Sequence, residues 1–409
     1  MKKSIKYLFA LTILVLAGCS NDDDKTTKEP VKDNEGKIVV LDSETLSLRL
    51  NQIIEASNFP GITVGIVKNG EQSYQDSFGY MDIAGNKPYT NQTVQSIGSI
   101  SKTFIAAALV KTIELDHFTL ETPINDILDQ PIVNPNNNDV IRIKHLVTHT
   151  SGIIDQEEVY LSSYYILEGE NLNGDGVQML QAAGVEQRQP KTLQEFIQAY
   201  FYEGGDYYST ENFMNNTPGT VQEYSNTAST LAAYLIEKAT ATPYEDFVKQ
   251  HILTPLQMNS TAYHYNELQA DKIATLYFNK NTPLPKYNLE TFPDGALKTS
   301  NEDMMKYLLN MMAGYRGNST TLFSQDSYNL VFNQITPTYS VFWDRDNNHN
   351  VGHTGGDPGL STEIYFNGND NSGFFIISNY DASSHDSHES HYIEITNQIE
   401  AAITDYLKL

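Results

Sequence analysis

The chain has 409 residues, of which 40% are apolar and 19% charged, a composition that fits a soluble globular protein and excludes wholesale disorder. Acidic residues outnumber basic ones by 51 to 26, and the formal net charge of −25 excludes broad electrostatic binding of nucleic acid. The single cysteine excludes an internal disulfide framework and a cysteine-rich metal site.

Residues 1–18 have the pattern of a bacterial export signal. Three lysines within the first six residues precede an apolar stretch, Tyr7 to Leu16, that is too short to cross a bilayer as a mature helix. The stretch leads into Leu-Ala-Gly-Cys, which resembles the lipoprotein box, in which the cysteine is lipidated and becomes the first mature residue. We therefore predict a signal peptide over 1–18 and a lipidated Cys19. The alternative is an ordinary secretory signal with an incidental cysteine.

Residues 19–42 are polar and predict a flexible tether. The acidic run after Cys19 resembles the surface-export signal of some lipoproteins, although a plain charged linker has the same composition. No second apolar run of about 18 residues follows, so the lipid on Cys19 is the only expected contact with a membrane. We expect a protein anchored in the cell envelope at the outer membrane, and which face it occupies stays open.

The folded domain is expected to span 43–409. Ser43 and the spacing of Leu and Ile up to Ile54 predict a capped amphipathic helix. Small and β-branched residues predict a strand over 61–68, and Asn69-Gly70 is a strong hairpin motif that leads into a second strand over 71–80.

The middle of the chain, about 91–330, has a mostly helical pattern. Apolar runs rich in Ala, Leu, Ile or Met predict helices over 101–115, 227–239 and 302–312. The stretch 155–216 is polar and rich in tyrosine, and we interpret it as an insertion that borders a cleft.

Strands are expected again near the C-terminus, over 361–366 and 373–378, followed by a helix over 391–407. Strands at both chain ends with helices between them predict the α/β (α+β) class, with one antiparallel sheet built from both ends and flanked by helices. An all-helical lobe would be inserted into it. This divides the domain into an α/β lobe, about 43–90 and 331–409, and a helical lobe, about 91–330.

The first chemical motif is Ser99-Ile100-Ser101-Lys102, at the expected start of the helix over 101–115. Positions three apart share a helical face, so the Lys102 amine can reach the Ser99 hydroxyl and activate it as a nucleophile. The helix N-terminus would favour developing negative charge and lower the pKa of the lysine. Taken alone, a serine at a helix start is usually a cap.

The second motif is Tyr224-Ser225-Asn226, which follows Pro-Gly and precedes a predicted helix. A tyrosine near a cationic lysine can act as a phenolate base. The spacing has little value by itself, because three other tyrosines also have Asn two residues later: Tyr89, Tyr277 and Tyr365.

The third motif, His353-Thr354-Gly355-Gly356, lies on an expected strand. A strand edge beside the nucleophile can present a backbone N–H to the reacting carbonyl, and a glycine permits close approach of the substrate. A glycine-rich turn is the plain alternative. Two further histidines, His145 and His149, share a helical face but lack the glutamate of a zinc-peptidase motif, and we interpret them as structural.

In this order the three motifs resemble the serine hydrolases of the class C β-lactamase and D-Ala-D-Ala carboxypeptidase type, the penicillin-binding-protein-like family. The stretches around them are also similar, including 97–104, 143–152, 295–300 and 352–360, so the resemblance covers about residues 45–405.

The resemblance implies a role for each motif residue. Ser99 would be the acylated nucleophile, and Lys102 and Tyr224 would share the proton transfer. Asn226 would bind the substrate or orient Lys102, while His353, Thr354 and Gly355 would line the substrate strand. The oxyanion hole would be the N–H groups of Ser99 and Gly356. Acyl transfer of this kind needs no cofactor and no metal.

The expected substrate is a small molecule or peptide: a small ester, an amide or a peptide of D-amino acids. The β-lactamase members typically have Lys where this chain has His353, which is mostly neutral at pH 7. Lys298 or Arg345 could supply the missing charge, but nothing in the sequence places either in the cleft. A β-lactamase or a D-Ala-D-Ala carboxypeptidase is the alternative. A non-catalytic surface-binding lipoprotein is the alternative from another class. The oligomeric state stays open.

Overall fold

The computed structural model of the chain describes residues 30–381 and 386–409. The predicted signal peptide, Cys19 and the first part of the predicted tether lie outside the described residues. No helix in the described part of the chain is both long and apolar enough to cross a membrane.

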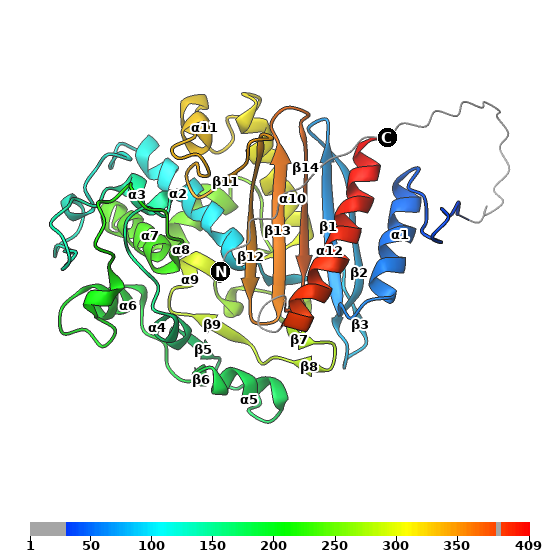
Figure 1. Cartoon of the computed structure of the whole chain (residues 1–409), viewed down its shortest axis with the longest axis horizontal. Coiled ribbons are helices and arrows are strands. Elements are labelled where there is room, and N and C mark those ends of the chain that lie inside the picture. The colour runs from blue at the N-terminus through cyan, green and yellow to red at the C-terminus, as the bar shows by residue number, and fades with distance from the viewer. Residues whose placement is uncertain (1–29, 382–385) are drawn as a thin grey trace.

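A seven-stranded sheet forms the centre of the molecule (Figure 1), and each pair of neighbouring strands in it is antiparallel. Its strands run in the order β11 (Asp344–Arg345), β12 (Asn350–Asp357), β13 (Leu360–Asn367), β14 (Ser372–Ser378), β1 (Gly61–Lys68), β2 (Glu71–Asp82) and β3 (Lys87–Pro88). Strand β1 pairs with β14 so that Val64 lies opposite Ile376. The two ends of the domain therefore meet in one sheet, which confirms the predicted fold class.

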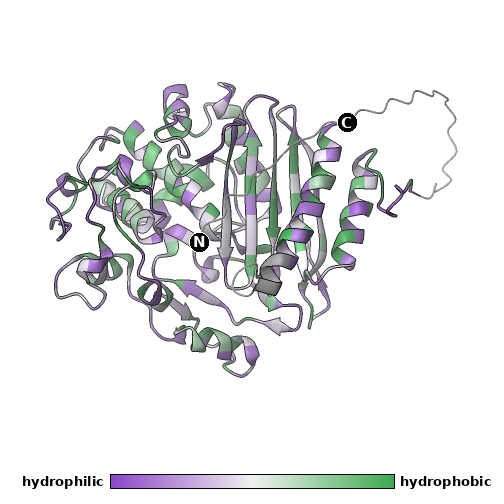
Figure 2. Cartoon of the chain, viewed as in Figure 1, coloured by the Kyte–Doolittle hydropathy of each residue, from purple (hydrophilic) through white to green (hydrophobic). Residues whose placement is uncertain are grey.

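Helices cover both faces of this sheet. On one face lie α1 (Ser43–Glu55) and α12 (Asp386–Leu407), whose apolar residues share a hydrophobic cluster with β1, β2 and β14. In Figure 2 both helices show a hydrophobic and a hydrophilic side, as expected for helices that lie on a sheet. Helix α10 (Asn301–Tyr315) packs on the other face of the sheet. The sequence analysis predicted that these residues would belong to the helical lobe.

The start of the folded part differs from the prediction in two details. Helix α1 is capped by Asp42, not Ser43, because Asp42 accepts the Thr45 N–H at 2.8 Å while Thr45 Oγ1 accepts the Asp42 N–H at 2.9 Å. Ile38 and Val40 are buried, and Lys32 bridges to Ile38. The last part of the predicted tether therefore packs on the domain.

The second lobe is mainly helical and packs around α2 and α7. Its helices are α2 (Ser101–Glu114), α3 (Ile143–Val147), α4 (Glu157–Ser162), α5 (Asp175–Ala182), α6 (Leu193–Phe201), α7 (Asn226–Thr240), α8 (Tyr244–Val248) and α9 (Phe292–Gly295), with α11 (Gln325–Phe332) packed against α2 and α10. The three helices predicted for the middle of the chain are present as α2, α7 and α10, with their ends shifted by a few residues.

The expectation of an all-helical lobe is wrong. Short strands join its loops into three small sheets: β4 (Val94–Ser96) with β10 (Lys298–Ser300), β5 (Tyr164–Ile166) with β6 (Glu186–Gln187) and β9 (Tyr287–Leu289), and β7 (Tyr277–Asn279) with β8 (Thr282–Pro283). The buried backbone of these loops needs hydrogen-bond partners, and short ladders supply them. Such pairings join segments far apart in sequence, which local patterns do not reveal.

Candidate active site

Ser99 lies where the sheet meets the helical lobe. It is the middle residue of η1 (Gly98–Ile100), a 3-10 turn that runs directly into α2. Gly98 suits this turn because its φ of +55° is in the left-handed region, which strains residues that carry a Cβ. A Cβ at position 98 would also lie only 2.9 Å from the Gly356 nitrogen on β12. The glycine therefore allows the turn that carries Ser99 to contact the edge of the sheet.

Lys102 reaches Ser99 from the first turn of α2, as the spacing predicts. Its Nζ lies 3.1 Å from Ser99 Oγ, 2.7 Å from Asn226 Oδ1 and 2.9 Å from the carbonyl oxygen of Asp294. The side chain is fully buried. Burial lowers the pKa of Lys102, and the nearby carboxylates, Asp294 foremost, limit the fall. Desolvation is thus the largest cause of the lowered pKa.

Tyr224 lies beside Lys102, whose Nζ is 5.1 Å from the centre of the tyrosine ring. The Tyr224 ring also stacks against His149. Burial raises the pKa of Tyr224 well above its usual range, and a hydrogen bond with Ser99 offsets only part of the rise. The expectation of a phenolate favoured by Lys102 therefore does not hold for the resting site, where Tyr224 is a neutral phenol.

Asn226 is fixed by the way α7 begins. Asp155, from the start of the predicted insertion, accepts the backbone N–H groups of Asn226 at 2.6 Å and Thr227 at 2.9 Å, and the Ser225 hydroxyl at 2.8 Å. A carboxylate at this position is favoured by the helix dipole. Asn226 Oδ1 then accepts from Lys102, so of its two expected roles the structure contains the contact that orients the lysine.

The third motif lies on β12, beside the Ser99 turn. Successive residues of a strand point to opposite faces, so His353 is 2% exposed while Thr354 and Gly356 are exposed. A Cβ at Gly355 would lie 2.2 Å from the Ile97 carbonyl oxygen and 3.1 Å from the Ser99 nitrogen. Gly355 and Gly356 therefore lie against the catalytic turn, and the buried His353 lies near Tyr224. The Thr354 side chain points away from the face that His353 occupies.

Two buried aspartates at the site were not singled out from the sequence. The Asp294 carboxylate accepts the hydroxyls of Thr230 at 2.8 Å and Tyr160 at 2.9 Å. The Asp357 carboxylate accepts the hydroxyl of Tyr164. Burial raises the pKa of Asp294 to about 6 and that of Asp357 to about 7. The sequence did hold one pointer: Asp294 directly precedes the Gly-Ala-Leu stretch that resembles a pocket floor.

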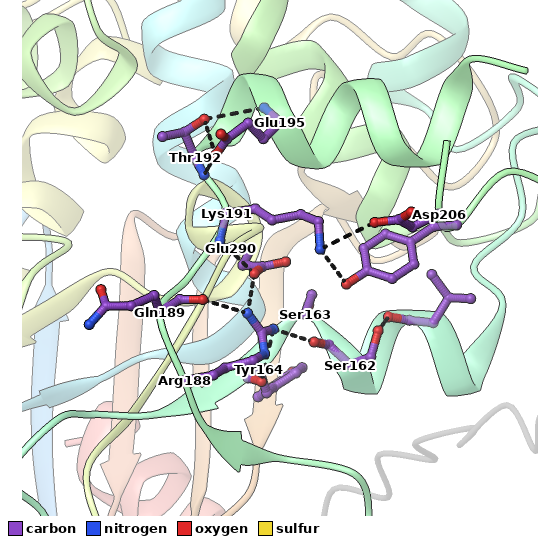
Figure 3. A network of polar contacts seen from close by, with 12 residues as sticks. Ser162, Ser163, Tyr164, Arg188, Gln189, Lys191, Thr192, Glu195, Asp206 and Glu290 are labelled. Carbon is purple, nitrogen blue, oxygen red and sulfur yellow. Dashed lines mark hydrogen bonds and ion pairs between the residues drawn. The ribbon is translucent and has the colours of Figure 1, made fainter. Parts of the chain in front are cut away.

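The predicted insertion supplies both Tyr160 and Tyr164, and Figure 3 shows the polar contacts that hold the insertion in place. Arg188 forms an ion pair with Glu290, whose side chain is fully buried, and also donates to the carbonyl oxygen of Ser162. Glu290 accepts the Lys191 N–H at 2.6 Å as well. These contacts join α4 and β5, which carry Tyr160 and Tyr164, to the segment that leads into Asp294.

Neither cation considered from the sequence is free to face a substrate. Lys298 is 1% exposed, and its Nζ donates to the carbonyl oxygens of Tyr263 at 3.0 Å and Ala296 at 2.8 Å and to Asn288 Oδ1 at 3.0 Å. Arg345 donates to Phe332 O and Ser340 Oγ. The amine that meets Ser99 is therefore that of Lys102.

An antiparallel sheet with a Ser-Lys-Tyr site at its edge defines the β-lactamase and penicillin-binding class of fold. The chain superposes on a penicillin-binding protein homologue from Pyrococcus abyssi with a TM-score of 0.66, at 23% identity over 87% of this chain and 77% of that one. It superposes on a penicillin-binding protein from Bacillus halodurans with a TM-score of 0.62, at 21% identity over 86% of this chain and 98% of that one.

The sequence comparisons agree. The Beta-lactamase family model matches residues 49–398, and the chain belongs to this family. It is 25% identical over 338 residues to protein flp of Staphylococcus aureus (strain MW2), covering 80% of this chain and 61% of flp. It is 24% identical over 335 residues to the human mitochondrial serine beta-lactamase-like protein LACTB, covering 72% of this chain and 60% of LACTB. The chain thus spans about three fifths of the length of these relatives.

Proposed function

We propose that the protein is a serine hydrolase that acts through an acyl-enzyme on Ser99. The observation that carries the proposal is the position of Lys102, a fully buried amine with a lowered pKa that touches Ser99 Oγ, Asn226 Oδ1 and the Asp294 carbonyl at once. A lysine with a lowered pKa whose Nζ contacts the serine hydroxyl can serve as the general base for that serine.

In the proposed reaction, the unprotonated form of Lys102, which the lowered pKa makes more accessible, takes the proton of Ser99 as the Ser99 Oγ bonds to the substrate carbonyl. The N–H groups of Ser99 and Gly356 hold the oxygen that becomes negative. Tyr224, a neutral phenol next to both residues, donates its proton to the leaving group as the bond to that group breaks, and regains one from Lys102. Water then adds to the ester, its proton returns to Ser99, and the acid is released.

The preferred substrates are uncharged small esters and amides, and D-amino-acid peptides only where no free carboxylate lies near the scissile bond. A penicillin or cephalosporin carries a carboxylate near the scissile bond, and Lys298 and Arg345, the two cations that might have bound it, are held by other partners. A chromogenic cephalosporin should therefore give a lower kcat/KM than p-nitrophenyl butyrate. A cephalosporin advantage of tenfold or more would favour the β-lactamase alternative.

Covalent labelling tests the nucleophile. A fluorophosphonate should add one adduct to the wild type and none to Ser99→Ala. Ser101→Ala is the matched control, because Ser101 is two residues away but its Oγ accepts the Leu297 N–H at 3.1 Å. An adduct on the Ser99→Ala protein would reject the assignment. An unlabelled, folded wild type would favour the non-catalytic binding protein.

We further propose that the protein is anchored in the cell envelope through lipid on Cys19, which lies outside the described residues. One lipidated cysteine carries the several acyl chains that stable anchoring requires. Cys19→Ala should move the protein from the membrane pellet to the soluble fraction. A variant that stays in the pellet after a salt wash would place the anchor elsewhere.

A further inference from the structure

His353 occurs in a single tautomer. Its Nδ1 lies 2.6 Å from the carbonyl oxygen of Thr354, and a carbonyl oxygen can only accept, so Nδ1 carries the hydrogen. Burial lowers the pKa of His353, which keeps the ring neutral. The second nitrogen, Nε2, must then present a lone pair.

This lone pair is buried without a partner. Among the residues that the structure describes, none hydrogen-bonds to His353 Nε2, although the residue is 2% exposed. The ring borders the site, since its centre lies 6.4 Å from that of Tyr224. An unsatisfied buried acceptor is costly, and a ligand that donates a hydrogen bond would remove the cost.

The charges around the ring select the same kind of ligand. Asp344, on the neighbouring strand β11, is the carboxylate that acts most strongly on His353, and Lys102 is the cation that acts on it. Lys102 is itself close to the carboxylates of Asp294 and Asp155. A substrate carboxylate would meet a lone pair and an excess of negative charge, whereas a hydroxyl, amide N–H or ammonium would meet an acceptor in a favourable field.

We propose that His353 Nε2 accepts a hydrogen bond from the leaving-group side of the substrate, and that the site selects leaving groups bearing a neutral or cationic donor. The assignment to the leaving-group side rests on the proposed function, because Tyr224, the neighbour of His353, is the proposed proton donor to that group. The inference names a substrate class and a specificity-determining residue.

Four phenyl acetates of similar size test it. Their leaving groups carry a meta hydroxymethyl, aminomethyl, methyl or carboxylate substituent, and each kcat/KM is divided by the alkaline hydrolysis rate of the same ester. The hydroxymethyl and aminomethyl esters should exceed the methyl ester about threefold to tenfold, the range of one hydrogen bond to a buried acceptor. The carboxylate ester should be the poorest. A carboxylate ester equal to the methyl ester, or no gain from the hydroxymethyl group, would overturn the proposal.

Variants separate the hydrogen bond from the charge. His353→Phe removes the acceptor, so the ratio of kcat/KM for the hydroxymethyl ester to that for the methyl ester should fall to about one, whatever the rate on the methyl ester itself. Asp344→Asn is the matched control, in which that ratio should persist while the extra advantage of the aminomethyl ester shrinks. A ratio unchanged in His353→Phe would reject His353 as the acceptor. If His353→Phe does not fold, the four esters tested on the wild type and on Asp344→Asn still test the proposal. A preference for the hydroxymethyl ester over the methyl ester that disappears in Asp344→Asn would reflect charge alone and would contradict the hydrogen bond.

Binding of the four phenol products, measured by calorimetry on the full protein, gives the same comparison without turnover. The hydroxymethyl and aminomethyl phenols should bind more tightly than the methyl and carboxylate phenols. If the phenols bind in this order but the protein hydrolyses none of the esters, the donor preference is upheld and the proposed hydrolase activity is rejected. If the esters are hydrolysed but the phenols bind in the opposite order, the hydrolase activity is upheld and the donor preference is rejected.

Discussion

The ring of His149 stacks on the ring of Tyr224, with centroids 4.4 Å apart and an angle of 30° between the planes. The same histidine holds both neighbours of the tyrosine. Its Nδ1 accepts the Ser225 N–H at 3.2 Å, and its carbonyl oxygen accepts the Glu223 N–H at 2.7 Å. His149 adopts a φ of +55°, which is uncommon for a residue with a side chain. His149, interpreted from the sequence as structural, thus positions the proposed proton donor.

Substitutions of His149 should lower kcat more than they change KM. His149→Phe keeps a ring against Tyr224 but loses the acceptor for Ser225, and His149→Asn keeps an acceptor and tolerates the left-handed backbone but loses the ring. We predict that each retains part of the activity and that His149→Ala loses about 10- to 100-fold in kcat, the effect of a small misplacement of a catalytic group. Steady-state kinetics on p-nitrophenyl butyrate checks this. A change confined to KM or to the melting temperature would contradict a positioning role.

The proton path predicts strong coupling between two residues. Lys102→Ala and Tyr224→Phe should each lower kcat by about two to four powers of ten, the range for loss of general acid–base help. The double variant should be little worse than either single one, because both residues serve one proton transfer. Tyr277→Phe is the control, since Tyr277 also precedes an Asn by two residues but its hydroxyl accepts the Ile83 N–H at 2.8 Å. Additive effects, or a large loss in the control, would contradict the assignment.

Asp357 should make the protein less stable as the pH rises. Its pKa is raised from 3.8 to about 7 by burial, so between these values the folded state holds a proton that the unfolded state has lost. The free energy of unfolding therefore falls across this window. The free energy of unfolding of Asp357→Asn minus that of the wild type should be about 2–4 kcal/mol higher at pH 8 than at pH 4. The asparagine keeps an acceptor for the Tyr164 hydroxyl. Urea unfolding at both pH values checks this, and equal differences would contradict it.

The ion pair between Arg188 and Glu290 should contribute to stability, because removal of Arg188 leaves a carboxylate in the interior. Arg188→Ala should lower the free energy of unfolding by about 2–4 kcal/mol. The pair of Lys249 and Glu267 is the control, because these side chains are 60% and 34% exposed and Lys249→Ala should cost about 0–1 kcal/mol. Urea unfolding measures both. If Arg188→Ala lowers the free energy of unfolding no more than Lys249→Ala does, the stabilising role of the Arg188–Glu290 ion pair is contradicted.

The sequence predicted the site wherever its residues are close in the chain. Ser99 and Lys102 are one helical turn apart, and the helix pattern by itself implies their contact, observed at 3.1 Å. The contact between Lys102 and Asn226 is different in kind, because it joins residues 124 positions apart. It was expected from the resemblance to a known family and not from spacing.

The sequence by itself therefore determined the antiparallel sheet from both chain ends, the main helices and the order of the three motifs, because these depend on periodicity, turn residues and local spacing. Only the tertiary structure decided the state of the catalytic groups. Burial keeps Tyr224 a phenol and lowers the pKa of Lys102, and the contact of His353 Nδ1 with the Thr354 carbonyl oxygen leaves the lone pair on Nε2. The tertiary structure also brings Asp294, Asp357 and the tyrosines of the insertion to the site. Desolvation and contacts between distant segments arise only when the lobes pack together, so no local pattern encodes them.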